Sequence, residues 1–310
     1  MSTQTNLLRS SGTAGGRSSI DEVPTIPARA LKGIVLLVCC ALVIIPFIGV
    51  ISTSIASQSH VTNSGGFVLW PDGLNLDAYR TIFNGGVVQR ALLVSVFITL
   101  AGTLISLAGS TMLAYALSRP GSFGQRPILM IVLFSILFSP GLIPNYLVVK
   151  QFGLLDSLLA LILPTAINGF NVIVLRAFFM GIPDSVIDSA RIDGAGDFRI
   201  FWSIVLPLSR AVLAVVGLFY AVGYWNAFFN AMLYINDTAK WPLQLVLRTY
   251  VINNTELSSG DLGGAAADQL PPQESIQMAI LVVSLVPILI VYPFLQRHFA
   301  KGMLTGAVKG

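Results

Sequence analysis

The segment 183-PDSVIDSARIDGAGDFRIFWSIVLP-207 is a polar interruption between two strongly apolar stretches, and we call it the polar loop. Gly194 and Gly196 lie near its centre, where glycine permits the backbone angles of a tight reversal. A second helical run, Phe198 to Leu206, leads into Pro207 and the next apolar stretch. The pattern predicts two short helices that are separated at the glycines.

The first of these helices is predicted to be amphipathic. Asp184 or Ser185 is the expected N-cap, and Asp188 follows Ser185 at the spacing of a capping box. Helical spacing places the apolar and the charged residues on two different faces. The apolar face comprises Val186, Ile187 and Ala190, and the charged face comprises Asp184, Asp188 and Arg191.

The composition of the whole chain is that of an integral membrane protein. Of its 310 residues, 55% are hydrophobic and only 10% are charged, and the mean hydropathy is +0.79. A bilayer core about 30 Å thick needs roughly 20 apolar residues in a helix. Six uncharged stretches meet this length, so we predict an all-α membrane protein with six transmembrane helices. They are residues 33–56, 91–117, 128–149, 157–175, 211–234 and 275–296.

The distribution of Lys and Arg predicts the orientation of these spans. Cytoplasmic segments are enriched in basic residues, and 13 of the 18 lie in the two termini and in the loops after the second and fourth spans. Both termini and the polar loop are therefore predicted to be cytoplasmic, and segments 57–90 and 235–274 are predicted to be external loops. Residues 1–30 are expected to form a disordered tail, 31–300 the six-span domain and 301–310 a short second tail. The basic residues are too dispersed to indicate nucleic-acid binding.

Several predicted spans contain features that interrupt or tighten helices. Pro140, Gly141 and Pro144 predict a kink or a helix end near the external side of the third span. The second span carries small residues at spacings that allow close helix contacts in lipid. These are Gly102, Ser106, Gly109, Ser110 and Ala114, and we interpret them as intramolecular packing positions.

Amide and aromatic side chains at membrane depth are candidates for a substrate path. Amides in broken helices either line a polar path or link helices, and both interpretations remain open for Asn168 and Asn171. Rings beside amides suit sugar recognition, although an interfacial aromatic belt gives a similar composition. The candidates are Asn168, Asn171, Tyr220, Tyr224, Trp225, Asn226, Phe229 and Asn230.

The polar loop resembles the signature of importer-type ABC permeases, which reads Glu-Ala-Ala, three residues, Gly, nine residues and Ile-x-Leu-Pro. Asp188 replaces the Glu on a shorter stem and Ser189 replaces the first Ala, while the Gly and the Ile-x-Leu-Pro match. In that family this loop is the coupling helix that docks on the ATPase subunit. The resemblance therefore implies ATPase-coupling roles for Asp188, Ser189, Ala190, Arg191, Asp193, Gly194, Ile204, Leu206 and Pro207.

The resemblance extends over nearly all of residues 31–310. Segments 219-FYAVGYWNAFFNAMLYINDTAKWPLQLVLR-248 and 301-KGMLTGAVKG-310 are most similar to permeases for uronate oligosaccharides or complex glycans. The family implies a type I ABC importer permease fold in a bacterial cytoplasmic membrane. It also implies a heterodimer with a second permease, two copies of a cytoplasmic ATPase that bind ATP–Mg, and an extracellular or periplasmic binding protein that delivers an oligosaccharide.

Other classes of function fit the sequence less well. The chain has no GxxxxGK[ST] motif, so it is not the nucleotide-binding subunit, and no cofactor is expected on it. No catalytic or metal-ligating set is expected either, because the spans contain no acid and the two histidines lie outside them. An ion-coupled carrier usually places a charge at membrane depth, which the six spans lack. Such a carrier, or a channel for small polar solutes, remains the alternative.

Overall fold

The computed structural model describes residues 26–84, 86–253, 255, 261–262 and 270–307, with side chains described as far as residue 293. Within these residues the chain is helical and has no strand. Most of the predicted 1–30 tail therefore lies outside the described residues. The helices are α1 (Ile26–Ile55), α2 (Gln58–Asn63), α3 (Asp77–Phe83), α4 (Val87–Ser118), α5 (Gln125–Leu137), α6 (Leu142–Gln151), α7 (Leu159–Ile162), α8 (Gly169–Met180), α9 (Asp184–Ile192), α10 (Asp197–Ile200), α11 (Leu206–Leu208), α12 (Arg210–Trp225), α13 (Phe228–Tyr234), α14 (Leu243–Leu247) and α15 (Gln273–Ala307).

The chain divides into two compact units, one up to Ile48 and the other from Gly49 onward. In the first unit, α1 is apolar around its whole circumference, and side chains such as Leu36, Leu37 and Leu42 are exposed. A helix with this pattern is suited to a lipid environment. The 30 residues of α1 are long enough to cross a bilayer.

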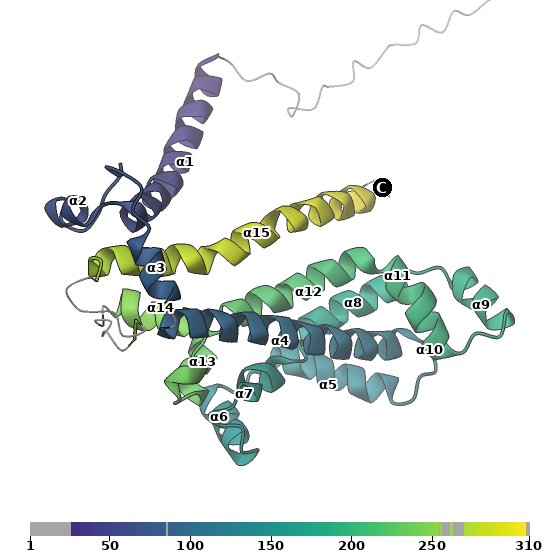
Figure 1. Ribbon diagram of the computed structural model, residues 1–310. Helices are drawn as coiled ribbons and strands as arrows, with labels where there is room; N and C mark the ends of the chain where they lie inside the picture. The colour runs from purple at the N-terminus through teal and green to yellow at the C-terminus, as the bar shows by residue number, and fades with distance from the viewer. Residues whose placement is uncertain (1–25, 85, 254, 256–260, 263–269, 308–310) are drawn as a thin grey trace, which may run out of the picture. The chain divides into compact units, whose positions relative to one another are not determined.

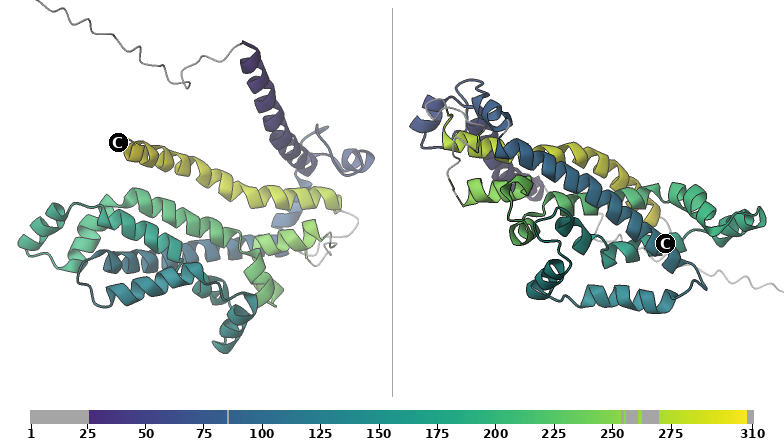
Figure 2. Two further views of the ribbon diagram at one scale, coloured as in Figure 1. Left: turned by 180° about the vertical axis from the view of Figure 1, so that it is seen from behind. Right: turned by 60° about the horizontal axis from the view of Figure 1, so that its bottom comes forward.

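The second unit is built around α4, which contacts α8, α12 and α14 (Figures 1 and 2). Its 32 residues give a length of about 48 Å. Gly102, Ser106 and Ser110 form a narrow stripe on α4 that lets α12 approach closely. The prediction that the small residues of this span serve intramolecular packing is confirmed at these positions.

Three of the predicted spans are interrupted. The third span ends at Leu137 and resumes at Leu142, after Gly141 with a φ of 87°, which confirms the predicted break. In the fourth, the segment 159–165 meets α8 at a bend of 51°. The fifth is divided at residues 226–227, where α12 ends and α13 begins.

These breaks prevent a simple count of spans. Within the described residues, three helical segments are long and apolar enough to cross a membrane, and five are if each bent pair counts as one span. The three segments are residues 26–55, 87–118 and 273–293. The predicted third span is divided between α5, of 13 residues, and α6, of 10 residues. The all-α class is confirmed, whereas the number six is not.

The two predicted external loops are partly helical. Segment 57–90 contains α2, α3 and the start of α4, and segment 235–274 contains α14 and a π-helical turn at Arg248–Ile252. Leu243, Val246 and Tyr250 are buried, and they share a face at helical spacing. Part of the second segment is therefore core rather than a solvated connector. At the other boundaries, α1 begins at Ile26 and α15 continues to Ala307.

The close approach at Gly102 yields a prediction about stability. A Cβ at this position would lie 2.8 Å from Cε2 of Tyr224, so Gly102→Ala is expected to lower stability by about 1–3 kcal/mol through overpacking. Thermal unfolding in detergent measures the loss. Gly223→Ala is the matched control, because its Cβ would meet nothing within 4 Å. Equal melting temperatures for the two variants would contradict the packing argument.

Candidate functional site

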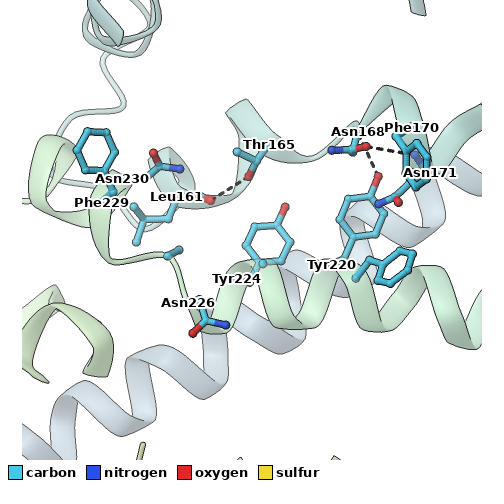
Figure 3. A pocket seen from close by; sticks show the side chains of 13 residues that line it. Leu161, Thr165, Asn168, Phe170, Asn171, Tyr220, Tyr224, Asn226, Phe229 and Asn230 are labelled. Carbon is cyan, nitrogen blue, oxygen red and sulfur yellow. Dashed lines mark hydrogen bonds between the residues drawn. The ribbon is translucent and has the colours of Figure 1, made fainter. Parts of the chain in front are cut away.

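A cavity of about 580 Å³ lies between the broken fourth span and the α12–α13 segment (Figure 3). Seven of the eight candidate path residues line it, namely Asn168, Asn171, Tyr220, Tyr224, Asn226, Phe229 and Asn230. The cavity has six further lining residues that were not among the candidates, namely Leu161, Thr165, Phe170, Phe219, Gly223 and Ala227. Phe219 lies seven residues before Asn226, a helical spacing that places the two on one face, whereas Phe170 has no such spacing to the candidate amides.

Trp225 does not line this cavity. Its ring is buried in a separate apolar cluster with Ile280 and Val283, and its Nε1–H donates to the Ser284 carbonyl at 3.2 Å. Successive residues of an α-helix are about 100° apart, so Trp225 and Tyr224 point to different sides of α12. Trp225 therefore lies apart from the other seven candidates.

The hydroxyls of Tyr220 and Tyr224 bind backbone groups at the break in the fourth span. The Asn168 N–H donates to the Tyr220 hydroxyl at 3.0 Å, and the Tyr224 hydroxyl donates to the Ile162 carbonyl at 3.2 Å. Each hydroxyl is also bonded to a serine of α4, Tyr220 to Ser110 at 2.6 Å and Tyr224 to Ser106 at 2.7 Å. Backbone groups freed inside a membrane need such partners.

This arrangement determines which groups of the cavity remain available to a ligand. The two tyrosine hydroxyls are occupied, so these side chains offer mainly their ring surfaces. Asn168 uses its Oδ1 to accept the Asn171 N–H as the N-cap of α8, which leaves its amide hydrogens available. Asn226 donates one amide hydrogen to the Val222 carbonyl, and its amide oxygen remains available as an acceptor. None of the lining residues carries a charge.

The polar loop folds as two helical pieces that meet at Gly194, which has a φ of 81°. This confirms the predicted break. The predicted cap is wrong, because α9 starts at Asp184 with Pro183 as N-cap, and no side chain caps it. Asp184 lies in the first turn, where its charge favours the helix through the macrodipole.

The faces of α9 are as predicted except at Val186, which was expected on the apolar face and is exposed. Ile187 and Ala190 are buried against the rest of the unit, whereas Asp184, Asp188 and Arg191 are exposed. Arg191 forms an exposed ion pair with Asp197 at 3.4 Å. Among the other predicted coupling residues, Ser189, Asp193, Gly194 and Pro207 are exposed, and Ile204 and Leu206 are half-buried.

Tyr115 connects the polar loop to α4. Its hydroxyl donates to the Asp197 carbonyl at 3.3 Å, and its ring centroid lies 4.8 Å from that of Phe201. The guanidinium of Arg119 lies 4.9 Å above the same ring. Because Ser106 and Ser110 are on the same helix, α4 contacts both the polar loop and the tyrosines of the cavity.

Comparison with known proteins assigns the chain to a family. Residues 92–305 match the family described as the binding-protein-dependent transport system inner membrane component. The chain belongs to this family. It is therefore a membrane-embedded permease of the carbohydrate ABC transporters, and members of the family are transport subunits that work with a further permease, an ATPase and a binding protein.

Individual relatives support a more specific resemblance. The permease is 50% identical over 275 residues to the Bacillus subtilis polygalacturonan/rhamnogalacturonan transport system permease protein YtcP, covering 89% of this chain and 96% of the relative. It is 46% identical over 271 residues to B. subtilis protein LplC, covering 87% and 90%. A solved bacterial ABC transporter involved in import of the acidic polysaccharide alginate has a chain that superposes with a TM-score of 0.81 at 31% identity, covering 89% of this chain and 99% of that one. The predicted ABC importer permease fold and the resemblance to uronate-type permeases are confirmed.

The tyrosine hydroxyls provide a second prediction. Tyr220→Phe leaves the Asn168 N–H without its partner and is expected to cost about 1–3 kcal/mol, and Tyr224→Phe is expected to cost a similar amount at Ile162. Thermal unfolding of the purified permease measures both. Tyr292→Phe serves as control, because this tyrosine is exposed on α15. Unchanged stability in both variants would show that the hydroxyls do not support the broken helix.

Proposed function

We propose that this chain is the transmembrane permease subunit of an ATP-driven ABC importer for oligosaccharides derived from acidic polysaccharides. The observation that carries the proposal is the uncharged cavity with its aromatic rings and amides. Rings stack on the C–H faces of sugars, and amides pair with hydroxyls as donors and acceptors. The relatives named for polygalacturonan, rhamnogalacturonan and alginate supply the substrate class.

In the proposed mechanism, an extracellular or periplasmic binding protein delivers the sugar to a heterodimer of this chain and a second permease. ATP–Mg binds to two copies of a cytoplasmic ATPase, and closure of these subunits moves the polar loop. Both termini lie on the cytoplasmic side of a bacterial cell membrane in this scheme, as the siding of Lys and Arg favours. For ATP to drive the cycle, it must bind better to the closed ATPase state, and the loop must link that state to one arrangement of the spans.

The contacts of Tyr115 support a route from the loop to the cavity. Displacement of α10 would act on α4 through the Tyr115 hydroxyl and its ring contact with Phe201. The same helix holds Tyr220 and Tyr224 by their hydroxyls. A movement of the loop would therefore reach both walls of the cavity through packed side chains rather than through a flexible connector.

The first experiment is purification of the tagged chain from its native membrane in mild detergent, followed by mass spectrometry of the proteins that copurify. A P-loop ATPase together with a second permease is the expected result. Recovery of the chain alone, even after crosslinking, would favour the alternative of a channel or an ion-coupled carrier. Family membership argues against that alternative.

The polar loop provides a prediction about coupling. Asp188→Lys reverses the exposed charge at the acidic position of the signature, and Gly194→Asp places a side chain where φ is 81°. Both variants are expected to lose sugar uptake while inserting normally and leaving the affinity of the binding protein unchanged. Asp77→Lys, which alters an exposed carboxylate on α3, is the control. Retained uptake in both loop variants would refute the coupling role.

The substrate class can be tested by adding charge to the cavity. Asn230→Asp introduces a carboxylate of nearly the same shape, and two like charges about 5 Å apart repel by roughly 3 kcal/mol at an effective dielectric constant of about 20. Uptake of oligogalacturonate in proteoliposomes should fall at least tenfold, and uptake of its neutral methyl ester should change much less. Equal losses for the two sugars would argue against an acidic substrate in this cavity.

A further inference from the structure

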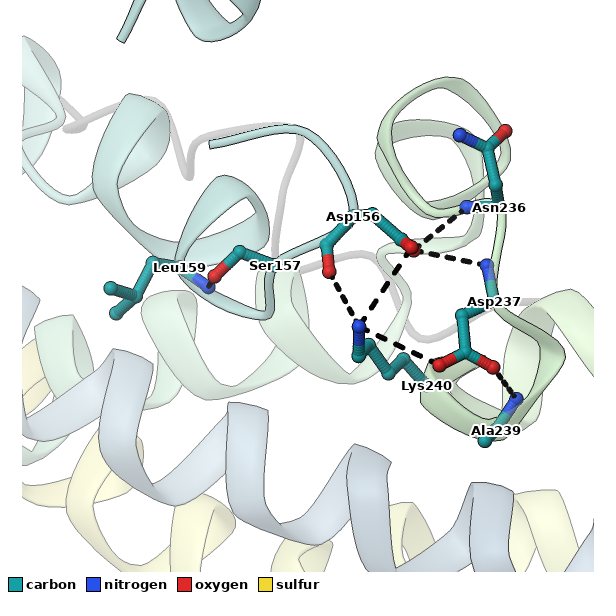
Figure 4. A network of polar contacts seen from close by, with 7 residues as sticks. All are labelled: Asp156, Ser157, Leu159, Asn236, Asp237, Ala239 and Lys240. Carbon is teal, nitrogen blue, oxygen red and sulfur yellow. Dashed lines mark hydrogen bonds and ion pairs between the residues drawn. The ribbon is translucent and has the colours of Figure 1, made fainter. Parts of the chain in front are cut away.

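Two segments about 80 residues apart in sequence are joined by a cluster of polar contacts around Asp156 (Figure 4). Asp156 lies between α6 and α7, and its contacts lie just beyond the end of α13. Its Oδ1 accepts the N–H groups of Asn236 at 3.1 Å and Asp237 at 3.0 Å. Its own N–H donates to the Tyr234 carbonyl at 2.7 Å.

Lys240 contacts both aspartates of this cluster. Its Nζ donates to the Asp156 carbonyl at 2.8 Å, and it lies 3.8 Å from Asp156 Oδ2 and 3.5 Å from Asp237 Oδ2. Asp156 has a φ of 61°, the only positive value at a non-glycine residue in the part of the chain that the structure describes. A backbone in this region persists when surrounding contacts hold it there.

The cluster matters because α13 is not held in line by α12. The helix breaks at residues 226–227, so the direction of α13 depends on contacts elsewhere along it. Its C-terminal end is fixed by Asp156 and by the stacking of Tyr234 on Tyr146, whose centroids are 6.3 Å apart. The same short helix carries Phe229 and Asn230, which line the cavity.

We propose that Asp156, Asp237 and Lys240 form a positioning cluster that fixes α13 and thereby sets how Phe229 and Asn230 meet the transported sugar. The inference concerning sugar rests on the proposed function, whereas the hold on α13 does not. It assigns to three polar residues outside the cavity a role in substrate recognition.

The contacts within the cluster are not equivalent. The ion pairs of Lys240 are about 40% exposed, and pairs of this kind contribute little to stability. Hydrogen bonds from backbone N–H groups to a carboxylate are stronger and more directional than such exposed ion pairs. The Asp156 carboxylate is therefore the principal member, and Lys240 is secondary.

The Asp156 carboxylate is ionised at neutral pH. The backbone N–H of Asp237 lowers its pKa below the ordinary value, and the N–H of Asn236 and the charge of Lys240 act in the same direction, against partial desolvation. A lowered pKa means that the cluster contributes stability above the ordinary pKa of about 3.9. This contribution is lost as the pH falls through the lowered value.

The test uses the purified complete transporter and two independent readouts. Hydrogen exchange followed by mass spectrometry reports on residues 228–234, and uptake of labelled oligogalacturonate into proteoliposomes gives KM and kcat. Asp156→Ala is expected to speed exchange in 228–234 without affecting α12, and to raise KM about tenfold with kcat changed less than twofold. Asp156→Asn should leave the exchange rate of 228–234 and KM close to those of the wild type, because its amide oxygen can still accept hydrogen bonds from the two N–H groups. Lys240→Met should have a smaller effect than Asp156→Ala.

A double-mutant comparison separates positioning from general destabilisation. If Asp156 acts through α13, then Asp156→Ala should raise KM little further in an Asn230→Ala background. Asp72→Ala is the matched control, because the Asp72 carboxylate also accepts a backbone N–H, that of Ser57 at 3.0 Å, in a different segment. It should leave KM unchanged.

Each outcome bears on the proposal. Unchanged exchange in 228–234, or effects of Asp156→Ala and Asn230→Ala on KM that simply multiply, would overturn it. A third outcome combines faster exchange in the Asp156→Ala variant with a wild-type transporter that does not import acidic oligosaccharides. This outcome would support the hold on α13 and would overturn the proposed substrate instead.

Discussion

The structure depends on satisfying backbone polar groups where its apolar helices are broken. In lipid no water is available to bind a free N–H or carbonyl, so a break is stable only where other groups replace the lost bonds. At the fourth span these groups are the hydroxyls of Tyr220 and Tyr224, each supported by a serine of α4. The break lies between Thr165 and Gly169, directly after the 3₁₀ turn that contains Pro164. The wall of the cavity and the contact between α4 and α12 thus involve the same four side chains.

This constraint also explains which polar groups of the cavity remain available to a ligand. Hydroxyls that support the backbone are not free to bind sugar, so hydrogen bonding to a ligand is left to the amides. The tyrosines still contribute flat apolar surface. Aromatic and amide side chains are close in sequence along α12 and α13, yet the tyrosine hydroxyls bind the backbone whereas the amides keep free hydrogen-bonding groups in the cavity.

Much of this architecture follows from the sequence because its signals are local. The glycine break of the polar loop, the small-residue stripe of α4 and the interruption near Gly141 each depend on residues whose backbone or size preferences are strong. The burial of Ile187 and Ala190 follows from helical spacing in the same way. Seven of the eight candidate path residues line one cavity, and amides are rare enough in apolar spans for their positions to stand out in the sequence.

The remaining features depend on tertiary contacts that local patterns do not contain. Trp225 lies outside the cavity, and a short aromatic run does not reveal which face of α12 meets α15. The predicted number of spans is not confirmed, since hydropathy counts apolar residues but does not show where a helix bends by 51° or 84°. Leu243 and Val246 pack against the helical unit although their segment looks like a connector, because only the fold shows what lies opposite. Asp156 gave no signal at all, since its partners are some 80 residues away.

The absence of charge among the lining residues has a consequence for the proposed cargo. A carboxylate moved from water into an uncharged cavity loses solvation, and amides replace only part of it. If the sugar carries uronate groups, the compensating positive charge must come from outside the residues that line this cavity, and a heterodimer offers the second permease as its source. The cavity of this chain would then recognise the hydroxyl and C–H surfaces that acidic and neutral sugars share. Selection for the acid would reside on the opposite wall, and the two subunits could change their preferences independently.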